Sequence, residues 1–278
     1  MKKAGYPVKQ ICRCLPVARS SFYARCKPKA IKPETLRLLA AIRQTHKDMD
    51  ATYGTRRMVV ELRELGFDVG RYKVSRLMKK LKLVAKRPKQ HRYPRYGQSS
   101  LLAPNSLNRQ FNPERANRYW SGDITYIRTS QGWLYLAIVM DLYSRRVISW
   151  AFSDKPNSEL TTRALRLAVN KRQPNQTVVF HSAHGGQYTS TAFQQCMEEH
   201  NIESSMSRKG NCLDNAVTER FFRSLKSERV NYRRYKTRQA AKADIIDYIE
   251  PFYNQKRRHA TLGNISPAEY ELNYLKTA

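Results

Sequence analysis

The sequence has few acidic residues and lacks the cysteine patterns of secreted or zinc-ribbon proteins. Its 278 residues include 22 Asp and Glu against 52 Lys and Arg, which gives a formal charge of +30. The five cysteines are odd in number and form no C-x-x-C pair, which argues against a disulfide framework or a zinc ribbon. A reducing compartment therefore fits the chain better than an extracellular one.

Long apolar runs and long heptad repeats are also missing. No segment reaches the length of a membrane span, and the start MKKAGYPVKQ leads into no apolar core of the signal-peptide kind. Without heptads, coiled-coil dimerisation would need another chain. We expect a cytoplasmic protein with no membrane partner, built from two or three small domains.

The positive charge is concentrated in the first part of the chain. Residues 1–118 contain 29 basic and 7 acidic residues, a net charge of +22, whereas residues 119–278 contain 23 and 15, a net charge of +8. So large an excess repels itself, and a polyanion such as nucleic acid is the partner that it fits. The first part is therefore predicted to carry the main electrostatic contact.

Residues 1–30 predict two short helices. Their apolar positions recur at helical spacing with a break at Pro16, which fits two helices joined by a tight turn, with Arg19 and Ser20 leading the second. The segment is either a DNA-reading helix-turn-helix or a basic helical hairpin without that role. Patterns this short match often by chance.

Residues 34–84 predict a helical DNA-binding domain. Apolar residues expected in its core recur at helical spacing and include Leu36, Leu39, Ile42, Met58, Leu62, Leu65, Val74 and Leu77. The opposite face of the last helix is basic and carries Arg71, Lys73, Arg76, Lys79 and Lys80. Solubility alone is usually served by mixed charge, so phosphate contact is favoured. Residues 85–118 are basic, bear prolines and lack apolar periodicity, which predicts an extended linker.

From Tyr119 the pattern changes to alternating strands and helices. Three consecutive strands joined by short turns, which implies antiparallel pairing, are predicted at 119–129, 132–144 and 146–154. They are followed by a helix at 158–172, a strand at 177–182, a helix near 190–200, a strand around 203–207 and a long helix from about Asp214. This order predicts a ribonuclease-H-like α/β fold, with a core at 119–230 and a helical extension of that core at 231–278.

Two acidic residues and one gap mark the expected site. Asp123 lies within the first strand, where a charged side chain is costly without a partner, and Glu219 lies on the last helix. The fourth strand runs into H-S-A-H-G-G, and the residue at its tip is Ala183, which has no functional chemistry. Two carboxylates from separate elements near a third position suit a hard cation such as Mg²⁺. Taken singly, Asp123 could equally be a structural carboxylate and Glu219 an exposed helix residue.

Five segments carry a resemblance to a known family. They are W-S-G-D-I-T-Y-I (120–127), G-W-L-Y-L-A-I-V-M-D-L-Y-S-R-R (132–146), H-S-A-H-G-G-Q-Y-T-S (181–190), S-M-S-R-K-G-N-C-L-D-N-A-V-T-E-R-F-F (205–222) and F-Y-N-Q-K-R-R-H-A-T-L-G-N-I-S-P-A-E-Y (252–270). They resemble the integrase-type core of two-frame insertion-sequence transposases, the insertion-sequence-three family, which are relatives of retroviral integrases. The helical region 53–83 resembles the DNA-binding segment that precedes such cores. The missing leucine-zipper portion suggests the second-frame product alone.

The resemblance implies an Asp, Asp, Glu triad that uses two Mg²⁺ ions, or Mn²⁺, to cut and join DNA strands. Carried over residue by residue, the first acid falls on Asp123 and the third on Glu219. The second falls on Ala183, and the family's 35 intervening residues are kept between Ala183 and Glu219. This chain is therefore predicted to be inactive, whether the alanine is engineered or natural. His181 and His184 flank the gap, but imidazole suits softer metals than Mg²⁺.

The resemblance also implies DNA contacts on the last helix. Lys226 follows Glu219 by two helical turns and Arg223 by one, on the same face. The alternative for Lys226 is an exposed lysine on a solvated helix. The implied partners are double-stranded DNA, as terminal inverted repeats and target, further copies of the chain on DNA, and the upstream-frame product, near the bacterial nucleoid. The rival function is a non-catalytic DNA-binding protein that represses or inhibits transposition.

Overall fold

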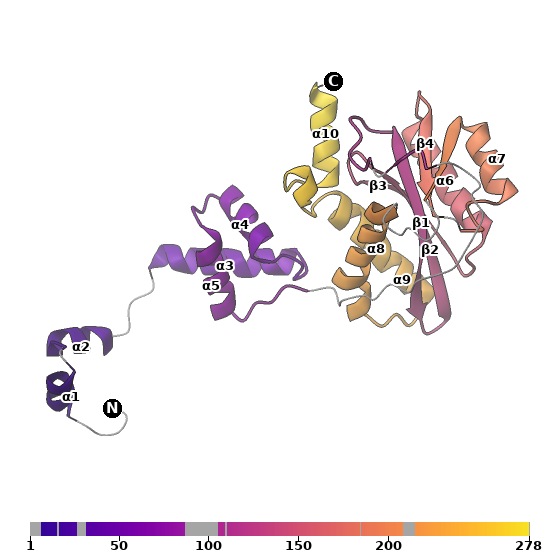
Figure 1. Ribbon diagram of the computed structural model, residues 1–278. Coiled ribbons are helices and arrows are strands. Elements are labelled where there is room, and N and C mark those ends of the chain that lie inside the picture. The colour runs from indigo at the N-terminus through magenta and orange to yellow at the C-terminus, as the bar shows by residue number, and fades with distance from the viewer. Residues whose placement is uncertain are drawn as a thin grey trace.

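The computed structural model describes residues 7–15, 17–26, 32–86, 105–108, 110–183, 185–207 and 215–277. Along the chain these form a pair of short helices, a three-helix domain and an α/β core (Figure 1). His184, most of the predicted linker and the predicted start of the last core helix at Asp214 lie outside the described residues.

The pair of helices at the amino-terminal end forms where the sequence predicted it. α1 spans Val8–Cys14 and α2 spans Arg19–Cys26. The side chains of Arg19 and Ser20, in the first turn of α2, are exposed. The helices are confirmed, and a DNA-reading role for α2 stays a prediction.

Three helices, α3 (Pro33–Asp48), α4 (Thr55–Glu64) and α5 (Arg71–Lys80), share one apolar core. Its buried members are Leu38, Ile42, Tyr53, Met58, Val59, Leu62, Val69, Val74, Leu77 and Met78. Leu36 and Leu65 were wrongly expected there, since they are 52% and 58% exposed. With Leu38 facing inward, Leu36 lies about 200° away around the helix. Leu65 is the C-cap residue of α4, where the chain turns into the next loop.

The core contains a five-stranded mixed sheet in the order β3-β2-β1-β4-β5. The strands are β1 (Tyr119–Thr129), β2 (Gly132–Asp141), β3 (Val147–Ser153), β4 (Val178–Ser182) and β5 (Ile202–Met206). The pairs β1–β2 and β2–β3 are antiparallel, whereas β1–β4 and β4–β5 are parallel. This topology confirms the predicted ribonuclease-H-like α/β fold. The second strand ends earlier and the third begins later than predicted, because a turn at 142–146 joins them.

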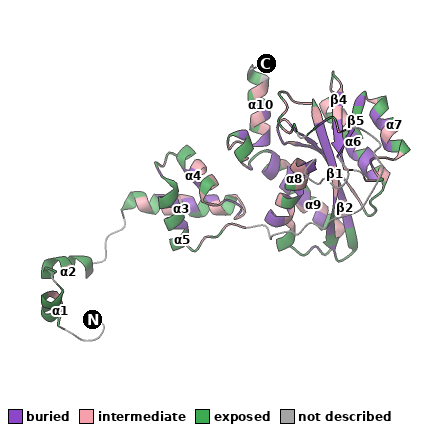
Figure 2. Cartoon of the chain, viewed as in Figure 1, coloured by how far each residue is buried: buried purple, intermediate pink, exposed green. Residues whose placement is uncertain are grey.

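Helices cover both faces of the sheet, so that its strands are buried between them (Figures 1 and 2). Ala137 and Val139 of β2 pack with α6 (Ser158–Arg172) and α7 (Thr191–Glu199). Leu136, Ile138 and Met140 point to the other face. They pack with α8 (Ala216–Glu228), α9 (Arg238–Asp247) and the wide helical segment η4 (Tyr248–Asn254). Because side chains alternate along β2, this strand contributes to the apolar core on each face of the sheet.

The end of the chain continues through the short helices η3 (Val230–Tyr232) and η5 (Ala260–Leu262) into α10 (Pro267–Thr277). The backbone N–H of Glu269 donates to the Ser266 hydroxyl at 3.2 Å, which caps α10. Within the described ranges, no helix is long and apolar enough to cross a lipid bilayer.

Packing of the core begins before Tyr119, inside the predicted linker. Leu107 is buried, and its backbone N–H donates to the Ser205 hydroxyl at 3.2 Å. The backbone N–H of Asn117 donates to the Asp141 carboxylate at 2.9 Å. The described end of the segment is therefore attached to the sheet and is not a free linker.

The three-helix domain contacts the last part of the core. The Tyr53 hydroxyl donates to the Lys256 carbonyl and accepts the backbone N–H of Arg258, both at 3.2 Å. The Arg258 guanidinium pairs with Glu61 of α4 at 2.7 Å and also with Glu64. Hydrogen bonds and charge pairing thus join the two domains.

Candidate functional site

Asp123 and Ala183 lie at the same level of two neighbouring parallel strands. The pairing of β1 with β4 runs from Tyr119–Val179 to Ser121–His181. Continued by two residues, this register sets Asp123 beside Ala183. β4 ends at Ser182, so the edge of β1 is open where Asp123 lies. The 35-residue spacing before Glu219 pointed to position 183, and the strand register independently sets the same position beside Asp123.

A buried polar network holds the start of α8 against β1. The Ser121 hydroxyl donates to the Asn215 side-chain oxygen at 2.6 Å and lies 2.7 Å from the Thr218 hydroxyl. Because Ser121 has one hydroxyl proton, Thr218 is the donor in the second bond. All three side chains are buried. Since buried polar groups keep their hydrogen bonds, this network fixes the first turn of α8, which carries Glu219, beside β1.

Close packing of the two central strands also positions the site. A Cβ on Gly122 would lie 2.4 Å from Cζ of Phe180, which is inside van der Waals contact. Glycine is thus required at Gly122 if the Phe180 ring is to keep its place. Sequence reasoning missed this contact and the network around Ser121, although a serine at a buried strand position was a visible signal.

The two carboxylates of the site are poorly neutralised. Burial raises the pKa of Asp123 to about 7; the Ile124 N–H and Lys226 oppose this rise, and the charge of Glu219 adds to it. Burial also raises the pKa of Glu219. The Ile124 N–H donates to Asp123 at 2.8 Å. In the described part of the chain neither carboxylate has a cation within 4.0 Å, so both suit a divalent cation as partner.

The donor set is nevertheless short of ligands. Among the described residues, no three His, Cys, Asp or Glu side chains come together as a metal-binding group. Position 183 would supply the third oxygen ligand beside Asp123, and it carries a methyl group. The residues present therefore fit a divalent cation held by Asp123 and Glu219 alone.

The lysine predicted to contact DNA lies near Asp123. Burial lowers the pKa of Lys226, and the charge of Asp123 opposes that effect. The Lys226 Nζ also lies 4.7 Å from the ring centre of Tyr126 on β1. Lys226 is thus half-buried beside the carboxylates and is not a freely solvated lysine, whereas Arg223 is exposed on α8.

His181 is held by hydrogen bonds to β5 and its end. Its ring is buried, with Nδ1 3.0 Å from the Ser205 hydroxyl and Nε2 3.2 Å from the Ser207 hydroxyl. Both ring nitrogens therefore bind serines of the neighbouring strand and its end. This agrees with the low suitability of imidazole for Mg²⁺.

Sequence reasoning also missed Tyr188, a buried aromatic residue in the loop after β4. It is buried against Phe193, at a ring-centre distance of 5.2 Å, and against Phe180, at 6.1 Å. Burial, together with the charge of Asp123, holds the pKa of Tyr188 well above its usual range. The phenol is therefore neutral.

The remaining predicted DNA-binding residues lie outside the sheet domain. Exposed side chains on α5 include Arg71, Lys73, Arg76, Lys79 and Lys80, as predicted. α2 and α5 belong to the two amino-terminal parts, away from the strands (Figure 1). The structure does not bring these residues together with Asp123 and Glu219.

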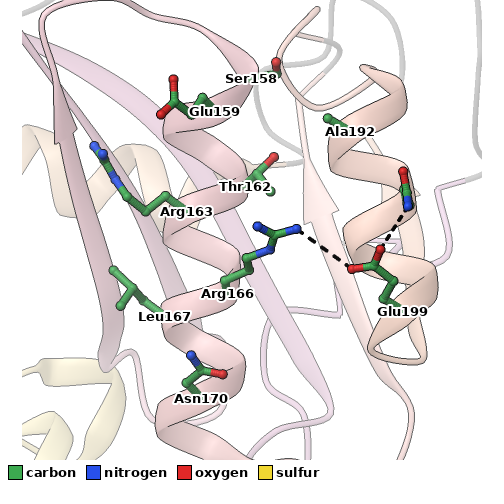
Figure 3. Close-up of a pocket in the computed structure, with 10 residues that line it drawn as sticks. Ser158, Glu159, Thr162, Arg163, Arg166, Leu167, Asn170, Ala192 and Glu199 are labelled. Atoms are coloured by element: carbon green, nitrogen blue, oxygen red, sulfur yellow. Dashed lines mark hydrogen bonds and ion pairs between the residues drawn. The ribbon is translucent and has the colours of Figure 1, made fainter.

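A groove of about 490 Å³ lies between α6 and α7 on the sheet face opposite α8 (Figure 3). It is lined by Thr162, Arg166 and Glu199, among others, and Arg166 pairs with Glu199 at 3.9 Å. Neither Asp123 nor Glu219 lines it. The volume of the groove therefore does not identify it as the candidate catalytic site, because the candidate carboxylates lie elsewhere.

Two solved structures show a weak overall likeness. One is the HTLV-2 integrase catalytic core domain in complex with magnesium, with a TM-score of 0.41 and 17% identity, covering 61% of this chain and 98% of that chain. The other is the catalytic core domain of BIV integrase, with a TM-score of 0.43 and 18% identity, covering 58% of this chain and 97% of that chain.

Sequence relatives are much closer and span nearly the whole chain. Residues 113–212 and 219–275 match families described as integrase core domain, and residues 33–91 match an HTH-like domain. Transposase InsF for insertion sequence IS3A of Escherichia coli (strain K12) is 36% identical over 278 residues, 97% of this chain and 95% of InsF. The insertion element IS600 uncharacterized 31 kDa protein of Shigella sonnei is 39% identical over 271 residues, 96% and 100%. The chain belongs to the family of InsF-like insertion-sequence transposases, with an HTH-like domain followed by an integrase core.

Proposed function

We propose that this chain binds the ends of an insertion element and that its core is built to cut and join DNA strands by metal-assisted phosphoryl transfer. The observation that supports this most is the under-neutralised pair of Asp123 and Glu219, brought together beside position 183. With Ala183 in that position, we propose that the chain binds DNA without cutting it.

Asp123 and Glu219 are the residues that would hold Mg²⁺, or Mn²⁺ in its place. When bound, the ion supplies positive charge that polarises a phosphate and lowers the pKa of bound water. Asp123 contributes a carboxylate fixed on a strand, and Glu219 one fixed on a helix by the Ser121 network.

With alanine at position 183, the site lacks one oxygen ligand, but the strands that surround this position keep their arrangement. In-line displacement assisted by a pair of ions requires ligands on both sides of the reacting phosphate. Asp123 and Glu219 alone suffice for one ion that takes its other ligands from water and DNA. The frame itself, with the register of β1 and β4 and the packing of Gly122 on Phe180, is intact.

DNA contact is assigned to two regions. The exposed basic face of α5 would bind phosphates of the terminal repeat, with Arg19 and Ser20 of α2 as a second contact. Near the carboxylates, Lys226 would attract the phosphate of the strand to be cut, and Arg223 would bind the backbone one turn earlier. We propose that copies of the chain assemble on paired ends and target in the bacterial cytoplasm, with the upstream-frame product as a further partner.

The direct test is Ala183→Asp in the full chain, assayed with a labelled duplex carrying one end of the encoding element and Mg²⁺ or Mn²⁺. We expect strand cleavage from Ala183→Asp, alone or with the upstream-frame product, and none from the parent chain. Ala183→Asn, which has similar volume and no charge, serves as the matched control and should remain inactive. Equal cleavage by the parent and Ala183→Asp would show that position 183 holds no metal ligand.

The same alanine supports a second candidate function, a DNA-binding protein that inhibits transposition. An intact binding frame with a failed site would compete for element ends with an active relative. In a mixed assay, the parent chain should lower cleavage by Ala183→Asp as its share of the protein rises. Cleavage that is independent of added parent chain would exclude this role.

A further inference from the structure

We propose that the exposed rings of Tyr126 and Trp133 form a stacking surface for an unpaired DNA base beside the strand to be cut. This surface lies on the hairpin of β1 and β2 and is separate from the candidate metal ligands and from the basic face of α5. The inference rests on the proposed DNA binding, and the experiment below distinguishes a failure of one from a failure of the other.

The two rings form an exposed aromatic pair. Tyr126 of β1 is 56% exposed and Trp133 of β2 is 46% exposed. Their ring centres lie 5.2 Å apart, with the ring planes at 87° to each other. In the register of the hairpin, Arg128 lies opposite Trp133 and Tyr135 lies opposite Tyr126, so the two rings are diagonal neighbours. Adjoining exposed apolar groups mark interaction sites, whereas singly scattered ones do not.

The tip of the hairpin is held in place by the segment that leads into α9. The Trp133 carbonyl accepts from the Arg238 Nε at 3.1 Å, and the backbone N–H of Arg238 donates to the Gln131 side chain at 2.9 Å. The backbone N–H of Ser130 donates to the Tyr235 carbonyl at 2.9 Å. A surface fixed in this way loses little conformational freedom when a ligand binds, which favours binding.

The surface is within reach of a DNA strand at the carboxylates. Tyr126 follows Asp123 by three residues, about 10 Å along β1, which is the length of about three nucleotides in one strand of B-DNA. The odd spacing puts the two side chains on opposite faces of the sheet. β1 continues past the end of β4 at Ser182, so its edge is open at this level (Figure 1). Around this edge Lys226 of α8, which packs on the face of Asp123, lies 4.7 Å from the Tyr126 ring centre.

The chemistry of the surface suits a nucleotide. Lys226 lies over one ring, and the exposed Arg128 lies opposite Trp133, so positive charge adjoins both rings. Aromatic rings that stack on bases, together with cations that contact the backbone, are the usual means of binding single-stranded nucleic acid. Bases within a duplex are stacked on one another, so only an unpaired base reaches the rings. A strand that separates near the cut would supply such a base.

The test compares two DNA probes of equal charge. Each is a labelled duplex of about 30 bp with a single-stranded extension of about three nucleotides, the span that separates Asp123 from Tyr126. The extension carries thymine bases in one probe and abasic sugar-phosphates in the other, and each pair is made with the extension on either strand. We expect the full parent chain to bind the thymine extension about tenfold more tightly on one of the strands.

Variants of Trp133 assign this preference to the rings. Trp133→Leu should remove most of the preference for the thymine extension, whereas Trp133→Phe, which keeps an aromatic ring, should retain it. The salt slope should stay as in the parent, because stacking releases no counterions. The matched control is Tyr232→Leu, since Tyr232 is also 56% exposed and has the Lys86 Nζ 5.1 Å from its ring centre. It should behave as the parent does.

Fluorescence gives a second measurement that does not depend on a leucine variant. Trp120 is buried and Trp133 is exposed, so a stacked base should quench Trp133 emission. We expect quenching by the thymine extension in the parent, little quenching by the abasic extension, and no such difference in Trp133→Phe. The same quenching by both probes would contradict stacking on Trp133.

The remaining outcomes separate this inference from the proposed function. Equal affinity of the parent for the two probes would overturn the stacking surface and leave DNA binding in place, as would equal losses in Trp133→Leu and Tyr232→Leu. Failure of the parent to bind either probe would overturn the proposed DNA binding and the surface with it. If Trp133→Leu kept the preference and instead dissociated copies of the chain in sedimentation, the rings would be a contact between copies and the DNA assignment would be wrong.

Discussion

Ala183 lies level with Asp123, because the parallel register of β1 and β4 offsets the two strands by 60 residues from Tyr119–Val179 to Ser121–His181. Neighbouring parallel strands thus present one carboxylate and one methyl group at the same height. If position 183 is a ligand position, as proposed, the loss is local, because the strands around it keep their register. A single side chain should then be enough to change the activity of the site.

The ionisation of Asp123 should make the free chain less stable as the pH rises. Its folded-state pKa, about 7, lies above the ordinary value of 3.8, so the folded state binds more protons between these values and stability falls as the pH rises through them. Asp123→Asn removes this titration. We expect the stability of the variant relative to the parent to increase by about 2 kcal/mol between pH 4 and pH 7, after allowance for solvent screening. Urea unfolding in EDTA measures it, and a difference independent of pH would contradict the raised pKa.

Magnesium should stabilise the parent chain weakly and Ala183→Asp strongly. A ligand that binds only the folded state raises stability in proportion to the logarithm of its concentration over Kd. Three carboxylates should bind Mg²⁺ at least tenfold more tightly than two, and Glu219→Gln should abolish the parent's response. Thermal unfolding against MgCl₂ measures this, with Glu199→Gln in the α6–α7 groove as control. A response that survives Glu219→Gln would place the ion elsewhere.

The basic face of α5 should account for a large share of DNA affinity. Neutralising Arg71, Arg76 and Lys80 together as glutamines should reduce the log–log salt slope by about 0.9 for each DNA phosphate that these side chains neutralise in the parent. All three side chains are exposed, so the Tm should change little. Arg163, Arg166 and Lys171 on α6, changed in the same way, provide a control of equal charge. Equal reductions in both triple variants would mean that net charge matters and the α5 face does not.

Lys226 should matter through its place beside the carboxylates. Lys226→Ala removes a charge that lowers the pKa of Asp123, and it removes the proposed contact with the strand to be cut. In the Ala183→Asp background we expect cleavage to fall at least tenfold, with partial rescue by Lys226→Arg. Lys236→Ala is the control for charge alone. Cleavage that is unchanged by Lys226→Ala would identify the lysine as a bystander.

The network between β1 and α8 should hold Glu219 in place. Ser121→Ala leaves the Asn215 side-chain oxygen without its donor and should cost about 1–3 kcal/mol. In the Ala183→Asp background it should lower cleavage more at low than at saturating Mg²⁺, because it acts through the ligand Glu219. Ser121→Thr keeps the hydroxyl and should retain more activity. An equal loss at all Mg²⁺ concentrations would assign the network to stability alone.

The sequence was sufficient to predict features that depend on local periodicity and spacing. The order of strands and helices, the start of α2 at Arg19 and the inward face of Ile42 follow from patterns a few residues long. Leu36 and Leu65 were misplaced because apolar character alone does not decide which side of a short helix faces the core. Asp123 stood out as a charge within an apolar strand, whereas the helix pattern left Glu219 open as an exposed residue until the resemblance paired the two.

Features that depend on distant contacts were not predictable in this way. Ser121 and Asn215 are 94 positions apart, and Tyr53 and Arg258 are 205 apart. Nothing in the local sequence around Arg145 indicates that its guanidinium will be buried. The attachment of Leu107 to β5 was missed for the same reason, since the apolar residues of its segment show no periodicity.

The contact between the three-helix domain and the core has a consequence for how such transposases diversify. Glu61 and Glu64 of α4 pair with Arg258, and Asp50 pairs with Lys86 and lies 3.9 Å from Arg229. The acidic side of the domain thus faces the core, and its basic α5 side is left outward. A three-helix domain transplanted from a relative that lacks these contact residues would lose its orientation on the core, even if its α5 helix matched the DNA sequence. If α5 reads the element end as proposed, recognition and catalysis in this chain would be inherited as a matched pair, and we expect new end specificities to arise by change on α5 more readily than by exchange of whole domains.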